Sequence, residues 1–213
     1  MVNKSAARSY WVLVIRQKYG RIGRNLIDGN VWMESKINYC TQCGGATVYQ
    51  VPEGDALDRA VCTQCQHIHY QNPKLITGTL CLSEDKVLLC RRAIEPRYGL
   101  WTLPAGFMEL NEACENAALR ETAEEACAYP VIRQLYTVIS LPHIGQVYMI
   151  YLADMTEPKF AAGEESLEVQ LFSEQDIPWD TLAFKTVTQT LQHYFHDRKH
   201  NQFPLRTFTI TSK

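Results

Sequence analysis

The chain has 213 residues, of which 46% are hydrophobic and 21% are charged, and its formal net charge is −2. This composition is that of a globular protein with enough residues for one medium domain and one small domain. The slight negative charge excludes a general basic field for nucleic acid or an anionic membrane. An anionic substrate would therefore have to be neutralised by local arginines or by a metal.

Residues 1–36 are expected to form a poorly ordered N-terminal extension, because they are basic, dotted with glycine and without a hydrophobic period. Their longest apolar run, "WVLVI", is too short for a signal peptide, and no run reaches the roughly 20 residues of a membrane span. We therefore expect a cytoplasmic protein. Met33 stands just before the first cysteine motif, and a translation start there is a hypothesis that mass spectrometry of the natural N-terminus would test.

Residues 37–71 contain two CxxC motifs separated by eighteen residues, a spacing typical of a structural four-cysteine zinc site. Each motif offers two thiolates from one tight turn, and two such turns complete a tetrahedron. Two disulfides are the alternative, which a reducing compartment disfavours. The sequence predicts a small zinc ribbon without an open position for catalysis, and its ligands are Cys40, Cys43, Cys62 and Cys65.

Residues 72–200 alternate between strand and helix patterns, so a mixed α and β domain is expected there, followed by a C-terminal tail over residues 201–213. Helical patterns cover 111–127 and 179–197, and Asn111 is the expected N-cap of the first helix. Apolar runs predict strands at 75–83, 86–92, 100–106, 131–141, 145–155 and 167–173.

The stretch "GFMELNEACENAALRETAEE", residues 106–125, holds six glutamates and one arginine. At about 100° per residue, Glu121, Glu124 and Glu125 share one arc of the predicted helix. Like charges at these spacings repel each other unless a cation lies among them, and hard cations such as magnesium prefer carboxylate ligands. A solvated acidic face is the alternative interpretation.

The order of these residues resembles the signature of the Nudix hydrolases. Gly106, five residues, Glu112, seven residues and then "RETAEE" keep the family's glycine, four glutamates and arginine at the family spacing. The resemblance implies the family's α+β fold, an α/β/α sandwich with a mixed β-sheet, over residues 72–200 behind the zinc ribbon. Two positions depart from the signature: Thr122 replaces an aliphatic residue, and Cys127 replaces a glycine that helps to end the helix.

The resemblance also implies a reaction, the hydrolysis of a nucleoside diphosphate linked to another group with catalytic magnesium or manganese. One glutamate would be the general base, although its identity varies within the family. The implied metal ligands are Glu121, Glu124, Glu125 and the carbonyl oxygen of Ala105.

Other residues around the signature have expected supporting roles. Arg120 and Glu112 lie on one side of the helix, so with Gly106 they are expected to brace the preceding loop. The family often takes a further acid from a later loop, and "GEESLEVQLF" offers Glu164, Glu165 and Glu168. Glu168 is our first choice, with an exposed carboxylate as the alternative.

Four residues are candidates for substrate binding. Arg91 and Arg92 end a strand that leads to the signature, and only one of them is expected to reach the site because neighbouring strand residues point to opposite faces. Arginine suits a bidentate contact with phosphate, although a surface ion pair is equally consistent with the sequence. Arg97 and Trp101 could flank a nucleobase, and a core position is the alternative for Trp101.

The choice of diphosphate depends on sequence resemblance. Nudix NADH pyrophosphatases also carry a zinc ribbon, but their "SQPWPFP" segment is replaced here by "SLPHIGQVYMIY". The segments "IHYQNPK", "RRAIEP", "LPAGFMELNE" and "ESLEVQLF" resemble a bacterial group similar to the plant chloroplast FAD pyrophosphohydrolase. That resemblance favours FAD, cleaved to FMN and AMP, with ADP-ribose as the close competitor.

Other functions stay open beside this one. A capped-RNA or NADH diphosphatase is possible within the enzyme class, and a non-catalytic ligand sensor or nucleic-acid-binding protein lies outside it. The complete acid set and the lack of a dense basic patch in the ribbon favour the enzyme and argue against nucleic acid as a partner. Family members usually dimerise, so a homodimer is expected, without membrane association.

Overall fold

The computed structural model describes residues 36–212. The expected extension over residues 1–36 and the proposed start at Met33 fall outside this part of the chain, apart from residue 36 itself. Within it, no helix is long and apolar enough to cross a membrane.

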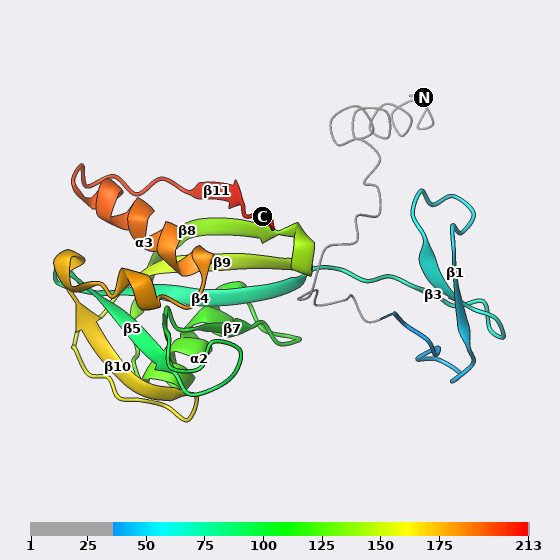
Figure 1. Ribbon diagram of the computed structural model, residues 1–213, viewed down its shortest axis with the longest axis horizontal. Coiled ribbons are helices and arrows are strands. Elements are labelled where there is room, and N and C mark those ends of the chain that lie inside the picture. Colours follow the sequence, from blue (N-terminus) through cyan, green and yellow to red (C-terminus); the bar gives the residue numbers. More distant parts are fainter. Residues whose placement is uncertain (1–35, 213) are drawn as a thin grey trace. The chain divides into compact units, whose positions relative to one another are not determined.

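The first part of the described chain forms a small antiparallel sheet. Its strands lie in the order β1 (Thr47–Gln50), β2 (Arg59–Cys62) and β3 (Ile68–His69) (Figure 1). Its apolar interior is very small: Ala60 and Val61 are buried beside the cysteines Cys40 and Cys62. A unit with so little buried apolar surface needs another source of stability, as expected for a metal-supported ribbon.

The larger domain is built on a mixed sheet in the order β10-β5-β4-β9-β8-β11 (Figure 1). The pairs β4–β9 and β8–β11 are parallel and the other pairs are antiparallel, while two short strands, β6 and β7, pair with β5 and β4. The strands are β4 (Lys74–Ser83), β5 (Lys86–Arg92), β6 (Trp101–Thr102), β7 (Ala105–Phe107), β8 (Val131–Leu141), β9 (Gln146–Asp154), β10 (Ser166–Phe172) and β11 (Arg206–Thr209).

Two helices, α2 (Cys114–Ala126) and α3 (Lys185–Arg198), cover opposite faces of this sheet. Alternation along β4 shows this directly, because Leu80 and Leu82 pack in one cluster with Leu191 of α3. Cys81, which lies between them, packs in a second cluster with Ala126 of α2. The predicted α/β/α sandwich with a mixed sheet behind a small ribbon is confirmed. Three short 3₁₀ helices complete the connections, η1 (Pro142–Ile144), η2 (Glu174–Asp176) and η3 (Trp179–Thr181).

The predicted start of the first helix at Asn111 is wrong. The helix begins at Cys114 with Ala113 as its N-cap, and Asn111 has a φ of 67° in the preceding turn. Glu112 also lies outside the helix, where its carboxylate accepts a hydrogen bond from the backbone N–H of Glu109 at 2.5 Å. The turn uses asparagine's tolerance of the left-handed region in place of its capping ability.

The segment after residue 200 adds a strand to the main sheet. β11 lies parallel to β8 at the sheet edge, with Arg206 opposite Thr137. Arg206 also forms an ion pair with the buried Asp197 at the end of α3, and Asp197 accepts a hydrogen bond from Tyr136 at 2.8 Å. This buried network attaches the C-terminal strand to both the sheet and α3.

Candidate active site and zinc site

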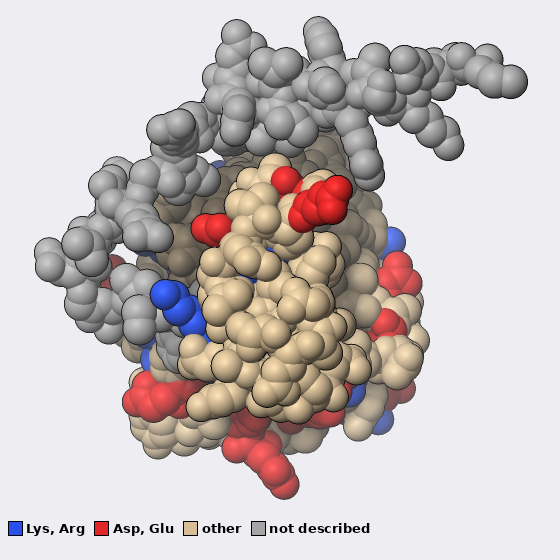
Figure 2. Space-filling view, turned by 90° about the vertical axis from the view of Figure 1, so that its right-hand side faces the viewer, with Lys and Arg blue, Asp and Glu red and all other residues tan. Residues whose placement is uncertain are grey.

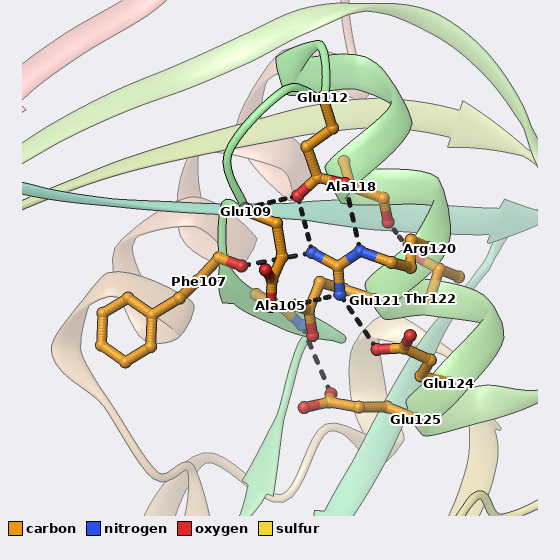
Figure 3. A network of polar contacts seen from close by, with 10 residues as sticks. All are labelled: Ala105, Phe107, Glu109, Glu112, Ala118, Arg120, Glu121, Thr122, Glu124 and Glu125. Carbon is orange, nitrogen blue, oxygen red and sulfur yellow. Dashed lines mark hydrogen bonds and ion pairs between the residues drawn. The ribbon is translucent and has the colours of Figure 1, made fainter.

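Three carboxylates of α2 lie around the guanidinium of Arg120 and the loop before the helix (Figure 3). Nη1 of Arg120 donates to Glu121 at 2.8 Å and to Glu124 at 3.0 Å. Glu125 turns to the other side, where it accepts a hydrogen bond from the backbone N–H of Ala105 at 3.3 Å. The spacing seen in the sequence therefore places three carboxylates on the side of α2 that faces Arg120 and β7, and we call these three residues the acidic group.

Arg120 connects this acidic group to the preceding loop. It donates to both carboxylate oxygens of Glu112, at 2.8 and 3.1 Å, and to the carbonyl oxygen of Phe107 at 3.2 Å (Figure 3). The hydrogen bond from Arg120 lowers the pKa of Glu112, as does the one from the N–H of Glu109. The loop over residues 107–112 is thus attached to α2 by a cation with five donors in a rigid arrangement.

Burial makes the acidic group costly to ionise. Glu125 is only 6% exposed, and burial raises its pKa to about 8, assisted by the charges of Glu121 and Glu165. Burial also raises the pKa of Glu121, although the hydrogen bond and the charge of Arg120 lower it, and the charges of Glu124 and Glu165 add to the rise. Arg120 compensates Glu121 and Glu124, whereas Glu125 forms no ion pair within residues 36–212. A bound divalent cation would relieve the burial cost of Glu125 and the repulsion among the three carboxylates.

The residues fit magnesium or manganese. Their donor atoms are carboxylate oxygens, which these hard cations prefer, and backbone oxygen atoms lie in the adjoining strand β7. Gly106 leaves the space that this arrangement needs, since a Cβ atom there would lie 2.2 Å from the carboxylate of Glu121. A side chain at position 106 would therefore displace the carboxylate of Glu121 from the place it occupies here.

The loop before β10 and the start of that strand carry the three candidates for a further acid, and their surroundings differ. Glu165 is the residue whose charge raises the pKa of both Glu121 and Glu125. Glu168 lies beyond a register shift in β10, where it forms an exposed ion pair with Arg91 at 3.2 Å. Glu164 is exposed on the loop.

The two arginines at the end of β5 point differently, as strand alternation predicts. Arg92 faces the acidic group, since its charge lowers the pKa of Glu125. Its guanidinium lies 5.3 Å from the ring centre of Phe184, and its Nε donates to the carbonyl oxygen of Pro96 at 2.9 Å. Arg91 lies in the ion pair with Glu168. Of the two, Arg92 is the one whose charge acts on the acidic group.

The remaining candidates for substrate binding, Arg97 and Trp101, do not converge on one point in the structure. Arg97 is exposed, with a φ of 71°. Trp101 is half-buried against the core, with its ring edge-to-face to Phe172 at 4.9 Å. Core packing is therefore the observed environment of Trp101.

The end of α2 explains how the chain accommodates Cys127 in place of glycine. Cys127 has a φ of 46°, the left-handed conformation that a helix-terminating glycine adopts, and its N–H donates to Ala123 at 3.0 Å. The next loop closes the other free carbonyls: the N–H of Ala161 donates to Ala126, and that of Gly163 to Glu125 at 3.1 Å. Gly163 was not identified from the sequence, where it is one loop glycine among several.

The cysteines of the ribbon converge as a metal site. The four sulfur atoms lie within 4.8 Å of one another, and neighbouring pairs are separated by 3.4 to 3.7 Å. A zinc tetrahedron with Zn–S bonds of about 2.3 Å has edges of about 3.8 Å. Backbone N–H groups of Gln42 and Gln64 point at Cys40 and Cys62, at 3.3 and 3.4 Å, which favours thiolates. In the described part of the chain all eight cysteines are free of disulfides.

Comparison with family models identifies both parts of the chain. Residues 38–71 match the zinc-ribbon model described as "Nudix N-terminal". Residues 73–194 match the model described as "NUDIX domain", which is more than half of the chain.

Individual relatives agree with this. A crystal structure of a NUDIX hydrolase from Nitrosomonas europaea is 50% identical and superposes with a TM-score of 0.80 over 83% of this chain and 100% of that one. An ADP-ribose pyrophosphatase of Methanocaldococcus jannaschii is 29% identical over 54% of this chain and 69% of its own length. The NAD-capped RNA hydrolase NudC of Photobacterium profundum is 26% identical over 72% of this chain, which spans 58% of that relative.

Proposed function

This chain belongs to the Nudix family of hydrolases, and on that premise we propose that it cleaves the diphosphate bond of a nucleoside diphosphate derivative. FAD, yielding FMN and AMP, is the proposed substrate, with ADP-ribose as the close competitor. The observation that carries the proposal is the acidic group itself. Glu121 and Glu124 are both bound by Arg120, the buried Glu125 contacts Ala105, and Gly106 leaves room for Glu121.

Each residue has a proposed part in this reaction. Glu121, Glu124 and Glu125, with the carbonyl oxygen of Ala105, would hold magnesium or manganese, which when bound neutralises phosphate charge and activates water. Arg92 would contact the diphosphate, since it is the arginine that faces these carboxylates. These metals and ligand roles belong to the proposal.

A general base must accept a proton from the attacking water. Glu165 is our choice for this role, because it is near Glu121 and Glu125 yet exposed on the loop. Within residues 36–212 its carboxylate forms no ion pair, whereas Glu168 is paired with Arg91.

The relatives support the substrate class but do not select one member of it. One is named an ADP-ribose pyrophosphatase and several are named NAD-capped RNA hydrolases, and both names denote adenosine diphosphate compounds. FAD rests on the sequence segments that resemble FAD pyrophosphohydrolases. A capped-RNA substrate is the second candidate because of the NudC relatives, although the face in Figure 2 shows scattered lysine and arginine side chains among acidic ones.

Two further properties belong to the proposal. A homodimer is proposed because members of the family usually dimerise. A reducing, cytoplasmic location is proposed because the ribbon needs four thiolates for zinc.

A substrate panel tests the function. Zinc-loaded protein would be incubated with FAD, ADP-ribose, NADH, NAD-capped RNA or diadenosine polyphosphates, with magnesium or manganese, and AMP release would be measured. We expect cleavage of FAD and ADP-ribose, and a loss of at least about 100-fold in Glu125→Gln because a buried ligand is removed. Glu115→Gln, an exposed acid on the same helix, is the matched control and should retain wild-type activity.

Two results would contradict the proposal. If no compound in the panel is cleaved, or if Glu125→Gln is as active as Glu115→Gln, the acidic group is not the active site. A clear preference for NADH or for capped RNA would leave the hydrolase standing and overturn the choice of FAD.

A further inference from the structure

A buried pair of threonine hydroxyls joins the helix of the acidic group to the sheet. Thr122 of α2 and Thr79 of β4 are both fully buried, and their Oγ1 atoms are 2.7 Å apart. Thr122 is the position at which the Nudix signature has an aliphatic residue. Here a hydrogen bond between two hydroxyls takes the place of apolar packing. Thr122, which forms it, lies in the sequence between the candidate ligands Glu121 and Glu124.

The directions of the hydrogen bonds can be assigned. Oγ1 of Thr122 lies 2.7 Å from the carbonyl oxygen of Ala118, which has no proton, so Thr122 must be the donor (Figure 3). Its single proton being used, Thr122 accepts from Thr79. Thr79 in turn accepts from the thiol of Cys81 at 3.0 Å, and burial raises the pKa of Cys81 to about 12, so that this thiol keeps its proton. The hydrogen bonds therefore run in one direction, from Cys81 through Thr79 and Thr122 to the carbonyl oxygen of Ala118.

Thr79 also holds the loop on the other side of the site. Its backbone N–H donates to the carbonyl oxygen of Pro104 at 3.1 Å. The preceding residue, Gly78, pairs with Ala105, and a Cβ atom on Gly78 would lie 2.4 Å from that same Pro104 oxygen. One short segment of β4 thus fixes both the loop that carries Ala105 and, through Thr122, the helix that carries the glutamates.

We propose that Thr79 and Thr122 are positioning residues that set α2 relative to Ala105 and Gly106, and thereby determine the affinity of the metal site. An aliphatic side chain at position 122 would let α2 shift along β4, because van der Waals contacts are not directional. A hydrogen bond between the two Oγ1 atoms allows little variation in their distance. Glu121, which lies against Gly106, would be the first ligand to lose its place if α2 moved. The inference rests on the proposed function, since it presupposes a divalent metal at these carboxylates.

Substitutions that remove only the hydroxyl test the proposal. Thr122→Val and Thr79→Val keep the shape, and Thr122→Ser keeps the hydroxyl. The matched control is Thr190→Val, because Thr190 of α3 forms a similar buried hydroxyl contact with Thr137 of β8, at 3.5 Å. Binding of Mn²⁺ to zinc-loaded protein would be followed by electron paramagnetic resonance without substrate. Melting temperatures, kcat and KM would be measured beside it.

The expected result is a dissociation constant for Mn²⁺ that rises about threefold to tenfold in Thr122→Val and Thr79→Val, the range that one buried hydrogen bond supplies. Thr122→Ser should restore it to within about twofold. Thr190→Val should keep wild-type affinity even if its melting temperature falls. In the metal-dependent reaction, kcat at subsaturating Mn²⁺ should fall while the KM for the nucleotide changes little.

Either of two outcomes would overturn the inference: unchanged Mn²⁺ affinity in both valine variants, or an equal loss in Thr190→Val, which would indicate general destabilisation. Failure of the proposed function is recognised separately with Glu125→Gln. If this variant binds Mn²⁺ as well as the wild type does, no metal lies at these carboxylates, and the positioning role is refuted with it.

Discussion

At the scale of single residues, the acidic group combines functional placement with a cost in stability. Glu125 is almost fully buried, and its principal hydrogen bond comes from the N–H of Ala105. Burial raises its pKa from 4.5 to about 8, so metal-free protein holds this carboxyl group protonated at neutral pH.

This placement predicts how stability depends on pH. Because the folded pKa lies above the unfolded one, the contribution of Glu125 to stability is fully present below pH 4.5 and is lost as the pH rises from there through about 8. Glu125→Gln removes this titration. Without magnesium or manganese, but with zinc retained, its melting temperature should exceed that of the wild type at pH 9 by about 2–4 °C or more, and by less at pH 6.

The control for this measurement is Glu115→Gln, whose melting curve should follow the wild type at both values of pH, because Glu115 is exposed. A constant difference between Glu125→Gln and the wild type from pH 6 to pH 9 would show that Glu125 is ionised in the folded protein.

At the scale of elements, helix α2 is fixed at both ends by loops. Arg120 binds the loop before it through Glu112 and Phe107, and the loop from β9 to β10 closes its C-terminal carbonyls. The second contact also carries Glu165 toward the acidic group. Its tightest point is Gly163, where a Cβ atom would lie 1.7 Å from the carbonyl oxygen of Glu124.

Gly163→Ala is therefore predicted to displace the loop from the end of α2. The backbone carbonyl of Glu124 cannot move aside as the end of a flexible side chain could. We therefore expect the free energy of unfolding to fall by about 2–4 kcal/mol. We also expect a loss of activity that exceeds the loss of nucleotide affinity. Chemical denaturation and steady-state kinetics would measure both. Ala162→Ser, which adds one atom at the exposed neighbouring position, is the control and should behave as the wild type.

A second element-scale prediction concerns the network around Asp197. Burial opposes its ionisation, but hydrogen bonds from Arg206 and Tyr136 prevail and lower its pKa. Its contribution to stability is therefore present above the unfolded pKa of about 4 and is lost as the pH falls below it. Arg206→Ala should reduce stability at pH 7 and should reduce it less at pH 3, as measured by denaturant titration.

At the scale of the whole molecule, the ribbon and the larger domain obtain their stability in different ways. The larger domain has an extensive apolar interior on both faces of its sheet. The ribbon buries little besides Ala60, Val61 and its cysteines, so the free energy of zinc binding must supply most of its folding.

We predict one zinc ion per chain, measured by plasma mass spectrometry after purification without added metal. Cys62→Ser should lower the content to near zero and remove the protection of ribbon amides from hydrogen exchange. Cys127→Ser, which alters an exposed thiol outside the ribbon, should keep its zinc. A disulfide between ribbon cysteines in freshly purified protein would contradict the zinc site.

Much of this molecule could be predicted from its sequence because the signals are local. Four cysteines at fixed spacing specify a metal ribbon, and carboxylates at helical spacing share an arc wherever that helix lies. Apolar runs such as residues 86–92 and 131–141 predicted the strands β5 and β8 within their observed bounds. The helix start at Asn111 was mispredicted, because a turn and an N-cap favour the same residue type.

What only the tertiary structure decided is which distant residues meet. A register shift in β10 places Glu168 beside Arg91 and leaves Glu165 near the acidic group, and no spacing rule in a loop reports such a bulge. The contact of Thr79 with Thr122 joins residues far apart in the chain and depends on how α2 lies on β4. The sequence by itself determined the chemical groups and their local order, because covalent spacing sets those. Packing between elements decided their partners, because the relative placement of helix, loop and sheet depends on the whole core.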